Sequence, residues 1–120
     1  MTAQVQSQPG HDVIVVGSGA GAMTSAVFLA DHGLRVLIVE KSDKYGGTSA
    51  ISGGGIWIPN NHYFARQGGN DSRELARRYL QASAGEHVAA ARLDAYLDNA
   101  ANMIETLTRT SRVRYAVAAK

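Results

Sequence analysis

The sequence predicts an α/β fold in which a parallel strand–helix–strand unit is followed by two helices. Two apolar runs, residues 12–16 and 34–39, flank a segment whose apolar residues follow helical spacing. Glycines stand at positions 17, 19 and 21, directly after the first run. Beyond residue 70, two further segments carry apolar residues at a spacing of three or four, which is typical of amphipathic helices.

The first strand leads into a turn of the G-x-G-x-x-G type, with Ala22 in the third glycine position. Gly17 permits a sharp turn at the strand end, and Gly19, which has no Cβ, lets the backbone approach a pyrophosphate closely. A small residue at position 22 lets the helix pack tightly on the strands. The free N–H groups and the dipole at the helix start attract phosphate. We therefore interpret the unit as the Rossmann-like half of a dinucleotide site.

The second strand ends on an acid, Glu40, about 20 residues beyond the glycines. Its carboxylate can accept hydrogen bonds from the hydroxyls of an adenosine ribose. Its charge repels a 2′-phosphate, which excludes NADP. The strand–turn–helix–strand pattern alone does not distinguish FAD from NAD.

The next segment, residues 41–61, favours FAD. It holds five of the 13 glycines of the chain, whereas an NAD-binding domain would continue with another regular strand and helix. Its backbone amides and hydroxyl side chains offer many hydrogen-bond donors, which suits the ribityl and isoalloxazine half of an extended cofactor. A flexible linker is the alternative, and it is disfavoured by the apolar residues Ile51, Ile56, Trp57 and Ile58.

Residues 15–26 read VVGSGAGAMTSA, and residues 39–61 read VEKSDKYGGTSAISGGGIWIPNN. These two segments resemble flavoproteins of the fumarate reductase and succinate dehydrogenase superfamily. Within that superfamily the chain is most similar to the 3-ketosteroid Δ1-dehydrogenase branch, and the WIPNN ending, residues 57–61, is the most specific feature. Residues 70–80 and 92–107 are also similar, so the resemblance covers nearly all of residues 12–115.

The resemblance implies a partial FAD-binding domain and a set of residues next to the cofactor. Relatives with covalent flavin carry a histidine after the second glycine pair, and residues 41–61 contain none, so non-covalent FAD is expected. Trp57 is interpreted as a packed aromatic, with a place beside the flavin as the alternative. The positions that the resemblance marks as FAD neighbours are Gly17, Ser18, Gly19, Ala20, Gly21, Glu40, Lys41, Ser42, Gly47, Thr48, Ser49, Ser52, Gly54 and Gly55.

The resemblance also implies an activity for the full-length protein, oxidation at a CH–CH group. In the steroid branch a base removes a proton beside the carbonyl-activated carbon, and the flavin accepts a hydride from the neighbouring carbon. A ketosteroid and an electron acceptor are therefore the expected partners. Family members are several times longer, so we expect a fragment or a truncated reading frame, with its catalytic residues beyond Lys120 and no turnover alone. The alternatives are a fumarate reductase-like enzyme acting on an activated C=C bond and a non-catalytic FAD-binding fragment.

Composition restricts the other classes of function. With 120 residues the chain forms one domain at most, and we expect residues 1–10 to be disordered and residues 11–120 to form the partial FAD-binding domain. A net charge of +2 without a basic cluster disfavours nucleic-acid binding, and four scattered histidines predict no metal site. The absence of cysteine excludes a thiol redox centre. Because neither a signal-peptide pattern nor an uninterrupted apolar span is present, we expect a cytoplasmic protein without a transmembrane segment.

The two helices are predicted from caps and spacing. Asp71, with Glu74 three residues on, predicts a helix start, and Gly85 ends that helix. A longer helix is expected over about residues 89–108, with one apolar stripe. A further strand is expected at the C-terminal end, with Tyr115 as a packed strand aromatic. The charged side chains expected to be solvated are Arg73, Arg77, Arg78, Asp94 and Asp98.

Overall fold

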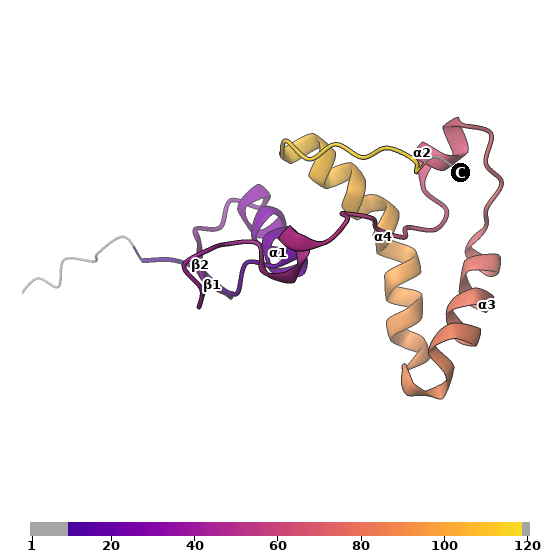
Figure 1. The fold of residues 1–120 in the computed structure, drawn as a ribbon, viewed down its shortest axis with the longest axis horizontal. Helices are drawn as coiled ribbons and strands as arrows, with labels where there is room; N and C mark the ends of the chain where they lie inside the picture. The colour runs from indigo at the N-terminus through magenta and orange to yellow at the C-terminus, as the bar shows by residue number, and fades with distance from the viewer. Residues whose placement is uncertain (1–9, 119–120) are drawn as a thin grey trace, which may run out of the picture. The chain divides into compact units, whose positions relative to one another are not determined.

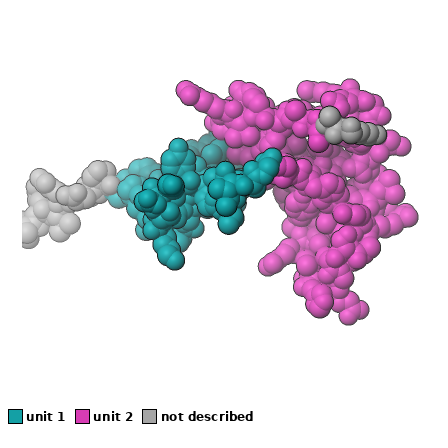
Figure 2. All heavy atoms as spheres, viewed as in Figure 1, with its two compact units in different colours: residues 1–54 teal, residues 55–120 magenta. Residues whose placement is uncertain are grey.

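The structure is a computed structural model that describes residues 10–118. Figure 1 shows the order of its elements, β1 (Val13–Val16), α1 (Ala20–Asp31), β2 (Val36–Val39), η1 (Gly47–Ile51), α2 (His62–Arg66), α3 (Arg73–Ala84), η2 (Gly85–His87) and α4 (Ala90–Thr110). The chain divides into two compact units, Met1–Gly54 and Gly55–Lys120, which Figure 2 colours separately. Residues 1–10 were expected to be disordered. Of these, residues 1–9 lie outside the part of the chain that the structure describes. The single domain expected over residues 11–120 stays a prediction.

The first unit is a two-stranded parallel sheet with one crossover helix. β1 and β2 pair in register from Val13 opposite Val36 to Val16 opposite Val39. Both strands consist of β-branched and other apolar residues, which fit a half-buried strand. α1 packs against both strands and buries Ala26. The predicted strand–helix–strand unit is therefore confirmed, with strands that begin one or two residues later than the apolar runs.

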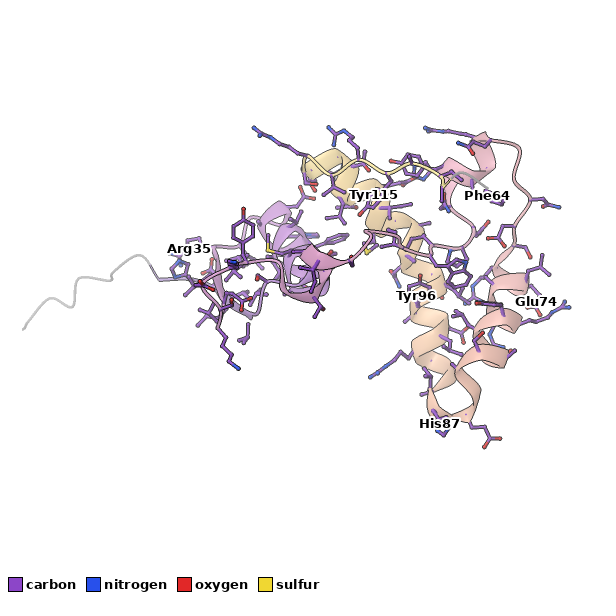
Figure 3. The ribbon with its side chains drawn as sticks, in the orientation of Figure 1. Arg35, Phe64, Glu74, His87, Tyr96 and Tyr115 are labelled. Atoms are coloured by element: carbon purple, nitrogen blue, oxygen red, sulfur yellow. The ribbon has the colours of Figure 1, made fainter. Side chains whose placement is uncertain are left out.

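An ion pair joins the starts of the two strands. The Asp12 N–H donates to the Arg35 carbonyl at 2.8 Å, and the Asp12 carboxylate accepts from the Arg35 N–H and from its guanidinium, each at 2.8 Å. Figure 3 labels Arg35 at this end of the sheet. Hydrogen bonds from the Arg35 side chain and backbone lower the pKa of Asp12 to about 2. The pair thus fixes the register of the strands at the end away from the glycine turn.

One face of the sheet carries exposed apolar side chains. Ile14 is 60% exposed and Val16 is 81% exposed. Because alternate residues of a strand point to the same side, these two mark one face. Parallel sheets are ordinarily covered on both faces. The described residues supply only one of those two layers.

The second unit is built on the neighbouring helices α3 and α4, which η2 connects. Figure 1 shows the two helices side by side. Four residues of the predicted stripe of α4 are buried, and α3 adds Ala76 to them. The buried residues of the stripe are Leu93, Ala100, Ile104 and Leu107. The long helix and its core-facing stripe are thus confirmed, and the helix extends two residues past its predicted end.

The start of α3 differs from the prediction. The cap is Ser72, whose Oγ accepts a backbone N–H three residues on at 3.2 Å. The carboxylate of Asp71 accepts the N–H of Asn60 at 2.7 Å instead. Glu74, expected to complete the cap, pairs with Arg78 at 3.1 Å. Asp71 was the wrong choice because its carboxylate accepts the N–H of the adjacent Ser72, at 2.8 Å, and that of Asn60, 11 residues away, where local spacing gives no signal.

The charged side chains of α3 and α4 are exposed or half-buried, in line with the solvation expected for them, and they also form ion pairs between the two helices. Arg77 Nε lies 2.9 Å from a carboxylate oxygen of Asp94, and Arg73 Nε lies 2.6 Å from one of Asp98. Arg73 also reaches Asp94, at 3.1 Å. The hydrogen bond from Arg77 lowers the pKa of Asp94, and the one from Arg73 lowers the pKa of Asp98. These pairs cross-link the two helices at a partly exposed surface.

The expected C-terminal strand is wrong for residues 113–118, which are irregular. A strand needs a partner to form a ladder, and in the described chain β1 and β2 pair with each other. The segment after α4, yellow in Figure 1, passes to α2, where Tyr115 packs edge-on against Tyr63. Burial raises the pKa of Tyr115, which confirms its packing but not its strand. Among the described residues, no helix combines the length and the apolar character needed to cross a bilayer.

Candidate functional site

The glycine turn connects the end of β1 to the start of α1. Gly17 has a positive φ of 93°, and its N–H donates to the Val39 carbonyl at 2.7 Å. Gly19 is the cap residue of α1 and brings no side chain to the helix start. The first N–H groups of a helix have no partner within it, so they can bind an anion. One of them, the N–H of Ala20, donates to Ser49 Oγ at 3.1 Å.

Ser18 is the polar centre of the turn. It is 3% exposed, and its hydroxyl donates to the Glu40 carboxylate. The same oxygen accepts the N–H of Gly46 at 2.8 Å. One buried hydroxyl therefore connects the glycine turn to the acid after β2 and to the glycine-rich segment, which lie 22 and 28 positions away in the sequence.

Glu40 is exposed, and each of its two carboxylate oxygens accepts a hydrogen bond from the protein. Ser18 donates to Oε2, and the Ser42 N–H donates to Oε1 at 2.9 Å. These two donors, Ser18 first, hold the pKa of Glu40 below its ordinary value, so the group is ionised near neutral pH. An ionised carboxylate offers about four acceptor sites, so some are left for the hydroxyls of a ribose.

The glycine-rich segment lies directly on the turn. Gly46 and Gly47 have positive φ angles of 107° and 54°. A Cβ at Gly47 would lie 3.4 Å from Gly19 Cα, and a Cβ at Gly46 would lie 2.6 Å from Ala50 Cβ. The absence of a side chain at Gly47 therefore leaves room between the two backbones, whereas its absence at Gly46 makes room for Ala50 within the segment itself.

The remaining predicted residues occupy less central places. Ser52 closes a local turn, because its hydroxyl donates to the Ser49 carbonyl at 2.8 Å and accepts the Gly54 N–H at 3.1 Å. Thr48 and Lys41 are exposed. Gly55 is the first residue of the second unit.

The structure brings together most of the predicted site residues, and it adds one that was missed. The cluster consists of Gly17, Ser18, Gly19, Ala20, Glu40, Ser42, Gly47 and Ser49. The residue missed is Gly46, which donates its N–H to Ser18. The doubled glycine at positions 46–47 is the sequence signal that could have found it.

The arrangement fits a dinucleotide. A helix start capped by glycine can face a pyrophosphate, and Gly19 and Gly47 themselves add no side chain there, although the Ser49 hydroxyl accepts the N–H of Ala20 at 3.1 Å. Glu40 supplies an exposed ionised acceptor beside that turn.

In the second unit, aromatic side chains pack around Trp57. Its ring centroid lies 5.2 Å from that of Tyr79 and 6.3 Å from that of Tyr96, and the Tyr96 hydroxyl donates to the Trp57 carbonyl. Figure 3 labels Tyr96 on α4. Trp57 thus packs as the sequence indicated, although it remains 48% exposed. A cavity of about 170 Å³ lies nearby, lined in part by Phe64, Ile104 and Tyr115.

Comparison with known proteins identifies the family. A family model described as "FAD binding domain" matches residues 12–119. A 3-oxosteroid 1-dehydrogenase of Mycobacterium tuberculosis is 50% identical over 93 residues, which are 78% of this chain and 16% of that protein. A 4-oxocyclohexanecarboxylate 2-dehydrogenase of Sinomonas cyclohexanicum is 47% identical over 72 residues, 60% of this chain and 12% of that protein.

A solved structure agrees with these relatives. The 3-ketosteroid Δ1-dehydrogenase of Sterolibacterium denitrificans, in complex with 1,4-androstadiene-3,17-dione, matches with a TM-score of 0.76 and 55% identity. That match covers 82% of this chain and 17% of that one. The chain thus spans about a sixth of the length of the steroid relatives it matches. The resemblance drawn from the sequence is confirmed: the chain belongs to the FAD binding domain family, and its cofactor is FAD.

Proposed function

We propose that this chain is the part of a 3-ketosteroid Δ1-dehydrogenase that holds the adenosine and pyrophosphate of FAD. One observation carries the proposal. The buried Ser18 hydroxyl joins Glu40 and Gly46 beside a helix start that has no capping side chain. This combination suits one anionic pyrophosphate and one ribose at the same turn. The identity to 3-oxosteroid 1-dehydrogenases supports the choice of enzyme.

Different residues of the site are proposed to bind different parts of FAD. The backbone around Gly17, Gly19 and Gly21 would face the pyrophosphate, and Glu40 would accept from the adenosine ribose. The glycine-rich segment, including Thr48, would run beside the cofactor towards the flavin. When bound, FAD supplies the acceptor for a hydride. This chain binds and orients FAD, while the base and the groups that polarise the substrate carbonyl are proposed to lie beyond Lys120.

The proposed substrate is a cyclic ketone, and a 3-ketosteroid is the first choice. The reaction removes a proton beside the activated carbon and a hydride from the next carbon, which leaves a C=C bond in the ring. A smaller ring ketone is the second candidate, because one similar protein is named for 4-oxocyclohexanecarboxylate. We also propose a separate electron acceptor that reoxidises the flavin, and a cytoplasmic location.

The first test is a titration of the purified apoprotein with FAD, followed by flavin fluorescence, with NAD as competitor. We expect saturable FAD binding that excess NAD does not displace, because the glycine-rich segment favours the longer flavin cofactor. Displacement by NAD would contradict the proposed site.

A second test addresses how FAD is held. Precipitation with trichloroacetic acid should release all flavin into the supernatant, because residues 41–61 offer no histidine for a covalent bond. For the activity, addition of a 3-ketosteroid to the full-length protein under anaerobic conditions should bleach the flavin absorbance. Bleaching by 4-oxocyclohexanecarboxylate, and not by the steroid, would favour the second candidate.

A further inference from the structure

We infer that Ser18 is a positioning residue that does not contact FAD and that sets the orientation of the Glu40 carboxylate for the adenosine ribose. The inference rests on the proposed role of Glu40. It changes the part given to Ser18 by the sequence, which placed this residue among the direct FAD neighbours.

Burial is the first argument. Ser18 is 3% exposed, whereas the residues around it in the turn are intermediate or exposed. A hydroxyl inside the turn has little surface left for a ligand. Its neighbour Glu40, in contrast, is exposed and ionised.

The hydrogen bonds are the second argument. A hydroxyl has one proton to donate, and Ser18 donates it to Oε2 of Glu40. Its oxygen accepts the N–H of Gly46 at 2.8 Å, which orients the hydroxyl. Ser18 therefore has no second proton for a phosphate or ribose oxygen. Its chemistry is directed at Glu40 and Gly46.

The third argument is a second hydrogen bond to the Glu40 carboxylate, from Ser42. Oε1 of Glu40 accepts the N–H of Ser42 at 2.9 Å. With one donor on each oxygen, the plane of the carboxylate is fixed, and its remaining acceptor sites point in fixed directions. Two ribose hydroxyls can then bind without first ordering the acid. Loss of Ser18 removes one anchor, while Ser42 retains the other.

The test compares two ligands and three substitutions in the full-length apoprotein. The ligands are FAD and an FAD analogue whose adenosine ribose lacks both hydroxyls. Ser18→Ala removes the hydroxyl, and Ser18→Cys keeps the approximate volume but offers only a weak donor. Ser25→Ala is the matched control, because the Ser25 hydroxyl donates to the Gly21 carbonyl of its own helix at 2.9 Å and is exposed.

For FAD, we expect both Ser18 variants to raise Kd about tenfold, as for the loss of a hydrogen bond to a charged group. For the dideoxy analogue, we expect less than a third of that effect, because the ribose contacts are already missing. Ser25→Ala should leave both affinities within about twofold. Circular dichroism of each variant establishes that it is folded, and Ser18→Cys serves if Ser18→Ala does not fold.

Two results would overturn the inference. An equal loss for both ligands would mean that Ser18 acts through general packing or through the pyrophosphate. Unchanged FAD affinity would mean that Glu40 needs no such anchor. Failure of the unmodified protein to bind FAD at all would instead defeat the proposed function, and the inference with it.

Discussion

Replacement of Gly46 by alanine should damage the FAD site through two separable effects. Gly46 has a φ of 107°, a conformation that residues with a Cβ rarely adopt. A Cβ built there would lie 2.6 Å from Ala50 Cβ, which is far inside van der Waals contact. The N–H of Gly46 is also the donor that orients the Ser18 hydroxyl. Any shift of the segment that relieves the clash therefore moves this donor.

The size of the effect follows from these two terms. A non-glycine residue at such a φ costs about 1–3 kcal/mol, and overpacking by one methyl group costs about 1–3 kcal/mol. Because Ala50 Cβ is part of a short rigid side chain, it cannot move away alone. We therefore expect Gly46→Ala to weaken FAD binding by at least about 2 kcal/mol, or about 30-fold in Kd.

The assay is fluorescence titration with FAD, combined with urea unfolding of the apoprotein. Gly46→Ala with Ala50→Gly removes the clash but keeps the unfavourable φ, so it should recover about half of the lost binding energy. Gly33→Ala is the control, because Gly33 also has a positive φ, of 81°, but lies beyond the end of α1, outside the proposed site; it should lower the stability and leave the FAD affinity of the folded protein unchanged. If Gly46→Ala bound FAD within twofold of the unmodified protein, and Ala50→Gly changed nothing, the geometric argument would be refuted.

Three further predictions concern the stability of each unit. Ile104→Ala should lower the free energy of unfolding by about 2–5 kcal/mol in a urea titration, since Ile104 is 2% exposed, whereas Leu75→Ala, at 55% exposure, should cost under about 1 kcal/mol. Arg35 lowers the pKa of Asp12 to about 2. The Asp12–Arg35 pair therefore stabilises the fold fully above about pH 4, and this stabilisation is lost as the pH falls towards 2. Asp12→Asn should flatten this part of an acid-unfolding curve, and an unchanged curve would contradict the prediction. Ser72→Ala should destabilise α3 by about 1 kcal/mol through loss of its cap, measurable as a lower unfolding midpoint.

Local patterns were sufficient for the elements of the first unit. The apolar runs, the glycines and the helical spacing all act over a few residues, so they predicted β1, α1 and β2 without tertiary information. The same holds for the stripe of α4, where Ile104 and Leu107 are buried as expected.

The predictions that were wrong depended on remote partners. Asp71 is a residue type that often caps helices, but its carboxylate accepts a hydrogen bond from the N–H of Asn60. The acids of α4 were expected in solvent, and Asp98 is exposed, but the ion pairs that Arg73 and Arg77 make with them from α3 were not predicted. Tyr115 was expected in a strand, but its segment is irregular and packs on Tyr63. In each case the deciding neighbour lies between 11 and 52 positions away, beyond the reach of local spacing.

The candidate site could be predicted from the sequence only in part. The type of each residue followed from the chemistry of a dinucleotide, so Gly19 and Glu40 could be selected from the sequence. The bond from Ser18 to Glu40 spans 22 positions, and the one from Gly46 to Ser18 spans 28. The sequence therefore predicted which residues surround FAD, and the structure supplied the hydrogen bonds on which the inferred supporting role of Ser18 rests.

In the first unit, the contacts that stabilise the fold are also those of the proposed FAD site. Among residues 10–54, the buried side chains are those of Ala26 and Ser18, and one face of the sheet is bare. So small an apolar core contributes little to stability, which leaves the hydrogen bonds around Ser18 as a large part of what holds the turn and the glycine-rich segment together. A ligand that binds only this folded arrangement adds about 2.7 kcal/mol at a concentration of 100 times Kd. Substitutions at Ser18 or Gly46 should therefore lower both the stability and the FAD affinity. A substitution at the strand starts, such as Asp12→Asn, should lower the stability, and it should reduce the apparent FAD affinity only because less of the protein is folded.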